Sequence, residues 1–189
     1  MTDFFSRWIT PDQMTLLRVL LIPAIYLLIL WDSELTLVVA FLFFTIACFT
    51  DYWDGVLARH TGKTTDWGKL LDPIADKILI TSLLVLLVSL DRAPAYLTVL
   101  IIVREFAISG LRSIAAIKGT VIAASSGGKV KTISQMFAVG FLILNYPTLG
   151  LPCHEIGIII LWIATAFSIW SGIKYFMAYY ETVPAQSPS

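Results

Sequence analysis

Six stretches of the chain are apolar for nearly the length that a membrane-spanning helix requires. A helix needs about 20 mainly apolar residues to cross the hydrocarbon core of a bilayer. The stretches cover residues 14–31, 35–53, 72–90, 94–114, 131–149 and 155–178. Hydrophobic residues make up 58% of the 189-residue chain and charged residues only 14%, a balance outside that of ordinary soluble domains. The sequence therefore predicts an all-α, polytopic membrane protein with six transmembrane helices.

Short connections with turn-forming residues separate these stretches. Asp32 and Ser33 follow the first stretch, Asp91 and Pro94 follow the third, and Pro147 lies near the end of the fifth. Such residues favour turns because they bond to the local backbone or restrict it. Consecutive helices are therefore expected to run antiparallel.

One domain is expected over residues 1–189, because no internal repeat divides the chain. The low-complexity run at residues 123–128, AASSGG, is expected to break a helix before Lys129. Phe and Trp side chains at helical spacing within residues 1–10 suit a short N-terminal helix in the membrane interface. A frayed terminus is the alternative for that segment.

The basic residues are placed unevenly, although the formal net charge is +0. The second and fourth connections are flanked by Arg59, Lys63, Lys69, Arg112, Lys118, Lys129 and Lys131, whereas the alternate connections contain only Arg92. Lys and Arg accumulate in the cytoplasmic connections of membrane proteins. Both of those connections and both termini are therefore predicted to face the cytoplasm from the cell (inner) membrane. The balanced charge gives no reason to expect nucleic acid as a partner.

Four carboxylates flank the second connection. Asp51 and Asp54 close the second apolar stretch, and Asp72 and Asp76 open the third. Helix residues three or four apart share a face, so two antiparallel helices could point all four inward. Four anions near a bilayer repel one another and need protons or cations to persist. Hard oxygen ligands with no histidine or thiolate nearby favour two Mg²⁺ or Mn²⁺ ions, a site suited to phosphoryl transfer.

Small residues accompany these carboxylates. Gly55, Ala58 and Gly68 leave room for a flat base or a phosphate to approach the backbone, although small residues also serve helix packing in membranes. Arg59 is placed to meet a phosphate. An ordinary anchor at the cytoplasmic face is the alternative for this arginine.

Together these residues spell D-x2-D-G-x2-A-R-x8-G-x3-D-x3-D from Asp51 to Asp76. In this pattern the chain resembles the CDP-alcohol phosphatidyltransferase family, with all eight fixed positions at the family's spacing. The resemblance implies a six-helix, usually homodimeric membrane fold in which the four aspartates hold two metal ions and Asp76 is also the general base. It further implies contacts with the CDP group of a lipid donor from Gly55, Arg59, Thr65 and Gly68. An upstream element matches more loosely, as Pro11, Asp12, Thr15 and Arg18.

Further cations indicate a second substrate that carries a phosphate. Arg104 lies inside the fourth apolar stretch, Arg112 lies near its end, and Lys129 and Lys131 follow the fourth connection. A buried arginine in a membrane is a functional hypothesis by default, and clustered cations suit a phosphate. Arg104 could instead form an ion pair with an intramembrane carboxylate, and the two lysines could be topology signals.

The surroundings of these cations extend the resemblance. The run Arg104, Glu105 and Phe106 with Arg112, together with Gly128 to Thr132 and Gln135, is similar to that of family members whose acceptor is sn-glycerol 3-phosphate. The implied reaction transfers the phosphatidyl group of CDP-diacylglycerol to that acceptor and gives phosphatidylglycerophosphate and CMP.

Two alternatives stay open at this point. A sibling transferase would use serine, inositol phosphate or phosphatidylglycerol as the acceptor. A cation transporter that uses the intramembrane carboxylates as an ion path is the more remote alternative.

Overall fold

The structure is a computed structural model of the chain. It describes the backbone of residues 11–61, 66–118, 126–148 and 150–182, and the side chains of residues 20–50, 77–118, 128, 130–148 and 150–182. The described residues form six α-helices and no strand: α2 (Pro11–Trp31), α3 (Glu34–Thr61), α4 (Asp66–Ser89), α5 (Ala95–Ile117), α6 (Ser126–Leu144) and α7 (Cys153–Thr182). The predicted all-α fold is confirmed, whereas the expected interfacial helix in residues 1–10 lies outside the described residues.

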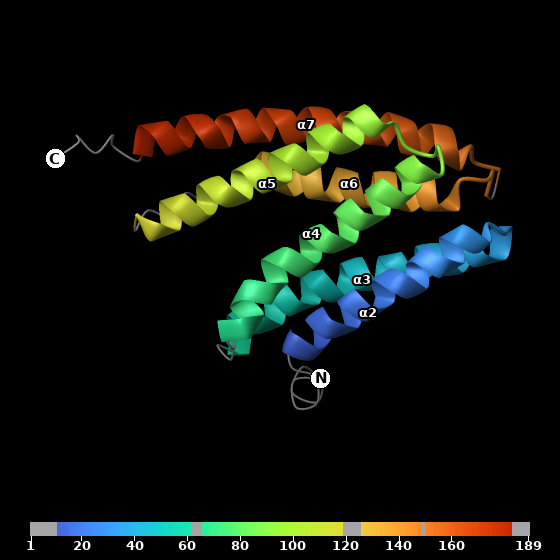
Figure 1. Ribbon diagram of the computed structural model, residues 1–189, viewed down its shortest axis with the longest axis horizontal. Helices are drawn as coiled ribbons and strands as arrows, with labels where there is room; N and C mark the ends of the chain where they lie inside the picture. Colours follow the sequence, from blue (N-terminus) through green and yellow to red (C-terminus); the bar gives the residue numbers. More distant parts are fainter. Residues whose placement is uncertain (1–10, 62–65, 119–125, 149, 183–189) are drawn as a thin grey trace.

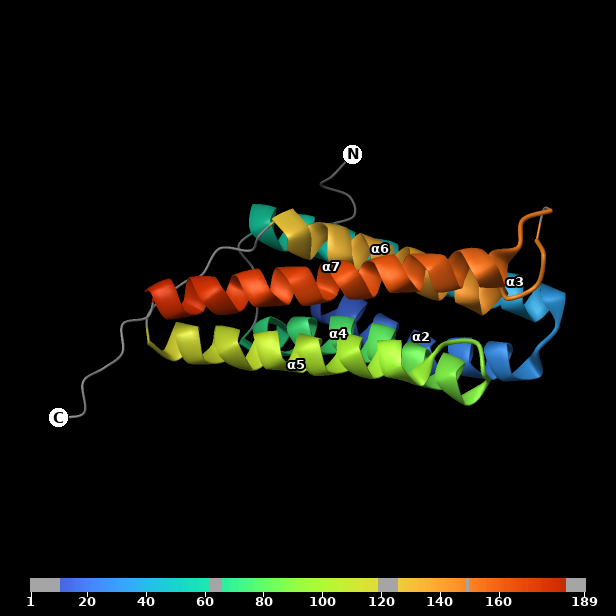
Figure 2. The ribbon, with the colours of Figure 1, turned by 90° about the horizontal axis from the view of Figure 1, so that it is seen from above.

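The helices run back and forth along the long axis of the molecule (Figures 1 and 2). α7 packs against both α5 and α6, and its contact with α6 is the most extensive in the bundle. α2 packs against α3 and α4, and the two groups meet where α3 contacts α6 and α4 contacts α5 and α6. Buried apolar residues recur every three or four positions, such as Leu79, Leu83 and Leu87 on α4, so each helix turns one face toward a shared core.

Three connections meet at one end of the bundle, which we call the short-turn end (Figure 1): residues 32–33, residues 90–94, and residues 145–148 with 150–152. Each contains a residue in the left-handed conformation just after a helix, with φ of 49° at Asp32, 56° at Asp91 and 55° at Asn145. Asp and Asn tolerate this conformation better than most residues because their short polar side chains bond locally. These residues therefore end α2, α4 and α6.

Arg92 ties these connections together. Its buried guanidinium donates a hydrogen bond to Oδ1 of Asp32, and the Tyr146 hydroxyl donates to the same oxygen at 3.4 Å. Ser33 and Thr36 cap the start of α3 reciprocally, with the backbone N–H of each donating to the hydroxyl oxygen of the other at 3.1 and 3.2 Å. Arg92 thus has a structural role, because it links two of the connections at the short-turn end.

The bounds of three helices, α3, α4 and α6, differ from the prediction by five residues or more. α3 continues to Thr61 instead of residue 53, and α4 begins at Asp66 instead of residue 72. Hydropathy marks only the apolar part of a helix, whereas backbone hydrogen bonding continues it through polar residues. α6 lies earlier than the predicted 131–149, because it starts at Ser126 and the left-handed Asn145 ends it. The glycines of the 123–128 run therefore lie in its first turn and do not break it.

The outer surface of the bundle is apolar. Large hydrophobic side chains are exposed on all six helices, among them Leu27, Phe49, Val85, Val103, Phe137 and Trp162. Such a surface is unusual in water and typical of contact with lipid. By length and composition α7 can cross a membrane, and the other described apolar segments are shorter: Leu20–Trp31, Glu34–Thr50, Lys77–Ser89 and Val130–Leu144. The remaining crossings stay predictions.

Gly157 lets α7 approach α6 closely, and its replacement tests that packing. A Cβ atom added there would lie 2.9 Å from Cγ of Leu142 and 3.1 Å from the Leu142 backbone nitrogen. We predict that Gly157→Ala lowers the free energy of unfolding in detergent by about 1–3 kcal/mol, because the backbone cannot easily yield. Thermal unfolding of the purified protein measures the change.

Gly110→Ala is the matched control, because no described residue beyond its own turn of α5 lies within 4 Å of a Cβ added at that position. This variant should be as stable as the wild type or more stable by up to about 1 kcal/mol, the difference in helix propensity. Equal stability of the two variants would contradict the packing argument.

Candidate active site

The carboxylate motif occupies the adjacent ends of α3 and α4. About three turns at the end of α3 carry Asp51, Asp54, Gly55, Ala58 and Arg59, and about three turns at the start of α4 carry Gly68, Asp72 and Asp76. Residues 62–65 join the two helices, so both sets lie at one end of the bundle, which we call the motif end (Figure 1). Each pair of aspartates shares one helix face. Side chains are not described for these residues, and Thr65 lies outside the described residues.

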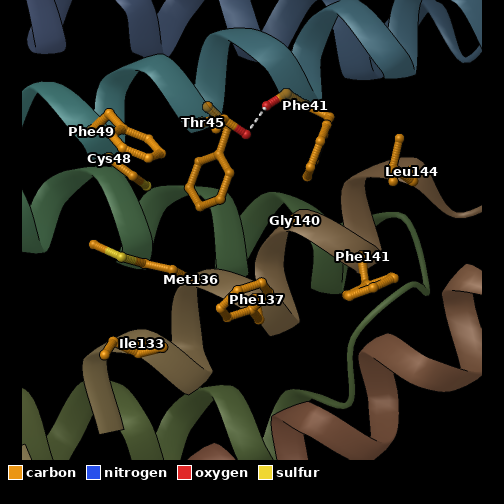
Figure 3. A pocket seen from close by; sticks show the side chains of 11 residues that line it. Phe41, Thr45, Cys48, Phe49, Ile133, Met136, Phe137, Gly140, Phe141 and Leu144 are labelled. Atoms are coloured by element: carbon orange, nitrogen blue, oxygen red, sulfur yellow. Dashed lines mark hydrogen bonds between the residues drawn. The ribbon is translucent and has the colours of Figure 1, made fainter. Parts of the chain in front are cut away.

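An apolar pocket of about 430 Å³ lies between α3 and α6 (Figure 3). Its walls are formed by Phe41, Phe44, Thr45, Cys48, Phe49, Ile133, Met136, Phe137, Gly140, Phe141 and Leu144. The hydroxyl of Thr45 is engaged within α3, because it donates to the backbone carbonyl of Phe41 at 2.8 Å (Figure 3). Phe49 precedes Asp51 by two residues, so the pocket approaches the motif end along α3. Its chemistry suits a hydrocarbon chain.

A group of charged side chains is buried between α5, α6 and α7. Arg104 donates from Nε to the Ser168 carbonyl at 2.9 Å and from Nη2 to Ser171 Oγ at 2.8 Å. Its Nη1 donates to Glu105 Oε1 at 3.1 Å, and Lys131 Nζ donates to the same oxygen. The side chains of Arg104 and Glu105 are each 14% exposed, and that of Lys131 is 9% exposed. We call these five residues the charged cluster.

Only part of the predicted cation group comes together here. Arg104 and Lys131 share Glu105, whereas Arg112 lies about two turns further along α5. Arg112 is exposed, and its guanidinium carbon lies 5.3 Å from the centroid of the Tyr175 ring, a cation–π contact. Lys129 lies in the first turn of α6, and its side chain is not described. The ion pair considered for Arg104 is present, and its partner is the neighbouring Glu105.

The sequence pattern did not single out the residues of α7 that complete the cluster. Buried small residues recur on one face of that helix: Gly157, Ala164, Thr165, Ser168, Ser171 and Gly172. A Cβ atom added at Gly172 would lie 3.2 Å from Cγ and Nε of Arg104, so a glycine there lets the arginine lie against α7. Small residues at this spacing mark helix interfaces in membranes and are the signal that could have identified this face.

Residues 8–170 match the CDP-alcohol phosphatidyltransferase family, and the chain therefore belongs to that family. The match spans the carboxylate motif together with Arg104, Glu105 and Lys131. The family is membrane-associated, and the chain is an enzyme of this class.

Curated relatives resemble the chain over most of its length. It is 38% identical over 185 residues to the CDP-diacylglycerol–glycerol-3-phosphate 3-phosphatidyltransferase of Bacillus subtilis, which covers 92% of this chain and 96% of the relative. The protein of the same name from Rickettsia felis is 39% identical over 169 residues, covering 89% and 93%. That from Haemophilus influenzae is 38% identical over 170 residues, covering 87% and 90%.

Proposed function

We propose that this chain transfers the phosphatidyl group of CDP-diacylglycerol to sn-glycerol 3-phosphate, giving phosphatidylglycerophosphate and CMP. The family membership and the names of the relatives support the reaction. The observation that carries the choice of acceptor is the charged cluster, which buries Arg104 and Lys131 side by side on one carboxylate. Two such cations suit an acceptor that carries a phosphate.

Asp51, Asp54, Asp72 and Asp76 form the proposed metal site. Their hard carboxylate oxygens, with no histidine or cysteine at a motif position, fit Mg²⁺ or Mn²⁺. The helix ends that carry them lie at one end of the bundle, which supports a shared site for two ions. Metal bound there would supply neutralisation of the negative charge that develops on the phosphate of CMP as it leaves.

Residues of the chain hold the substrates and move the proton. Asp76 accepts the proton of the acceptor's primary hydroxyl, whose oxygen bonds to the phosphorus attached to diacylglycerol while the bond from that phosphorus to CMP breaks. The CDP group is contacted by Gly55, Ala58, Arg59, Thr65 and Gly68. Arg104 and Lys131 bind the acceptor phosphate, with Arg112 and Lys129 contributing from the same end of α5 and α6.

The apolar pocket is proposed to receive an acyl chain of the lipid donor. It lies on the same helix as Asp51 and Asp54 and ends just before them, so a lipid seated there would present its headgroup to the motif. Because its walls are apolar, the pocket would discriminate between acyl chains only by their length and shape.

We place all six helices across the inner membrane, with the motif end in the cytoplasm. The apolar outer surface supports the crossings. The orientation is supported by the basic residues of the connections at residues 61–66 and 117–126, since at the short-turn end Arg92 is paired with Asp32. Glycerol 3-phosphate would then arrive from the cytoplasm, and the CDP group of the lipid donor would lie at the same membrane face while its acyl chains stay within the membrane. The chain is proposed to act as a homodimer, which chemical crosslinking in native membranes would detect.

Acceptor choice is tested by CMP release from the purified protein in detergent with CDP-diacylglycerol and Mg²⁺. Glycerol 3-phosphate should drive the release, and serine, inositol phosphate and phosphatidylglycerol should each give less than about a hundredth of that rate, because a site built for one polar ligand strongly rejects others. A sample without acceptor measures background hydrolysis. If another alcohol drives CMP release, the proposed acceptor is wrong, although the reaction type of the family still holds.

Asp76→Asn should leave the protein folded and lower kcat by about 10²- to 10⁴-fold, the range expected for loss of a general base. Asp91→Asn makes the same change at the short-turn end, where φ is 56°, a conformation that asparagine also tolerates. That control should keep wild-type activity, and thermal unfolding should show both variants folded. An Asp76→Asn rate within tenfold of the wild type would reject the base assignment.

Removal of divalent ions with EDTA should abolish CMP release, and Mg²⁺ or Mn²⁺ should restore it, because the four aspartates need cations to stay together. Electron paramagnetic resonance of added Mn²⁺ measures binding without turnover. The double variant Asp51→Asn, Asp54→Asn should bind less Mn²⁺ than the wild type. Full activity in excess EDTA, or equal Mn²⁺ binding by both proteins, would rule the metal site out.

A further inference from the structure

The charged cluster places one carboxylate between two cations. Arg104 Nη1 and Lys131 Nζ both donate to Oε1 of Glu105, so the two nitrogens lie within about 6 Å of each other. All three side chains are at most 14% exposed. Two like charges this close in apolar surroundings repel strongly, and a single unpaired charge there is costly. Glu105 therefore offsets the repulsion between Arg104 and Lys131.

Helix α7 fixes the other side of the Arg104 guanidinium. Nε is held by the Ser168 carbonyl and Nη2 by Ser171 Oγ, and Gly172 leaves the space that the arginine stem occupies. The orientation of the guanidinium is thus set by the protein on two sides. A guanidinium has five N–H donors. Three of them donate within the described part of the chain, which leaves two for a ligand.

A further polar side chain lies on the Lys131 face of α6. Gln135 follows Lys131 by four residues, so the two share a helix face. The glutamine is 4% exposed, and its Nε2 has no hydrogen-bond partner among the described residues. Buried donors are rarely left unpaired in native proteins. A ligand oxygen in this layer would satisfy it.

We propose that Glu105 is a positioning residue for the acceptor, because it holds Arg104 and Lys131 in the arrangement that binds the phosphate of glycerol 3-phosphate. The inference rests on the proposed function and extends it to a side chain outside the predicted binding set. Two cations against one carboxylate leave the three side chains with a net positive charge, which still attracts a phosphate dianion. Ordering these cations in advance removes part of the entropy cost of binding.

Glu105→Gln tests the inference, because it keeps the size of the side chain and removes its charge. The KM for glycerol 3-phosphate should rise by about tenfold or more, as expected for disturbing charge-assisted hydrogen bonds. The KM for CDP-diacylglycerol should change by less than about twofold, since the proposed CDP site lies on α3 and α4 and no residue of the charged cluster lines the acyl-chain pocket. Inorganic phosphate serves as a probe of the anion site alone, and its inhibition constant against glycerol 3-phosphate should rise in parallel.

Glu105→Asp separates positioning from packing. This variant restores the charge on a shorter side chain, so its acceptor KM should lie between those of the wild type and Glu105→Gln. A role in packing alone predicts no such rescue, because aspartate fits the original space less well than glutamine does. Thermal unfolding of each variant reports stability separately from kinetics.

Glu155→Gln is the matched control. It makes the same change at an exposed residue in the first turn of α7, about 20 Å along the helix from Ser168. All its kinetic constants should equal those of the wild type. An acceptor KM within twofold of the wild type in Glu105→Gln overturns the inference, and so does a parallel change in both KM values with no rescue by aspartate. If Glu105→Gln does not fold, an unchanged acceptor KM in Glu105→Asp overturns it as well.

The wild-type enzyme separates a failure of this inference from a failure of the proposed function. If the wild type releases CMP with inositol phosphate but not with glycerol 3-phosphate, the proposed acceptor is wrong. Inositol phosphate then replaces it in the Glu105 experiment, which decides the inference with the same outcomes. If only an acceptor without a phosphate monoester supports release, both proposals are overturned.

Discussion

The burial of charge inside an apolar bundle is the constraint on which the rest of this structure depends. Arg104, Glu105 and Lys131 come from two helices, and α7 supplies the carbonyl and hydroxyl that complete the bonds of the arginine. Each group must find its partners, because an unpaired charge away from water is far more costly than a paired one. The cluster therefore fixes how three helices meet, even though desolvation offsets much of its own stabilisation. At the short-turn end the buried Arg92 also pairs with a carboxylate, that of the half-exposed Asp32.

The small-residue face of α7 serves packing and polar contact at once. Gly157 brings the helix against Leu142 of α6, and four turns later Gly172 admits the stem of Arg104. A helix that approaches its neighbours this closely can use its backbone as a ligand, as the Ser168 carbonyl does for Arg104. Close approach in membranes depends on such small residues, because lipid offers no hydrophobic force to press helices together.

Features that depend on neighbouring residues were accessible from the sequence. Turn chemistry located the ends of α2 and α4 at Asp32 and Asp91, and helical spacing placed Asp51 and Asp54 on one face of α3 and Asp72 and Asp76 on one face of α4. Features that depend on distant residues were not accessible. Lys131 lies 26 residues from Glu105, and Ser171 lies 67 residues from Arg104, so no local sequence pattern predicts either contact. The predicted lengths of α3 and α4 were too short, because hydropathy does not detect the polar helical turns, at the end of α3 and the start of α4, that carry the motif. The assigned roles of the aspartates, of Thr65 and of the four cations stay predictions.

The distribution of these contacts along the chain also sets an order of assembly during synthesis, in which N-terminal segments emerge first. Both halves of the carboxylate motif are present once α4 has been made, about midway through translation. Tyr146 lies 114 residues after Asp32, so this hydrogen bond can form only after α6 has been made. The hydrogen bonds from Arg104 to Ser168 and Ser171 form last, because both serines belong to α7. A nascent chain that stops before α7 would carry the complete motif and yet leave Arg104 without two of its three partners.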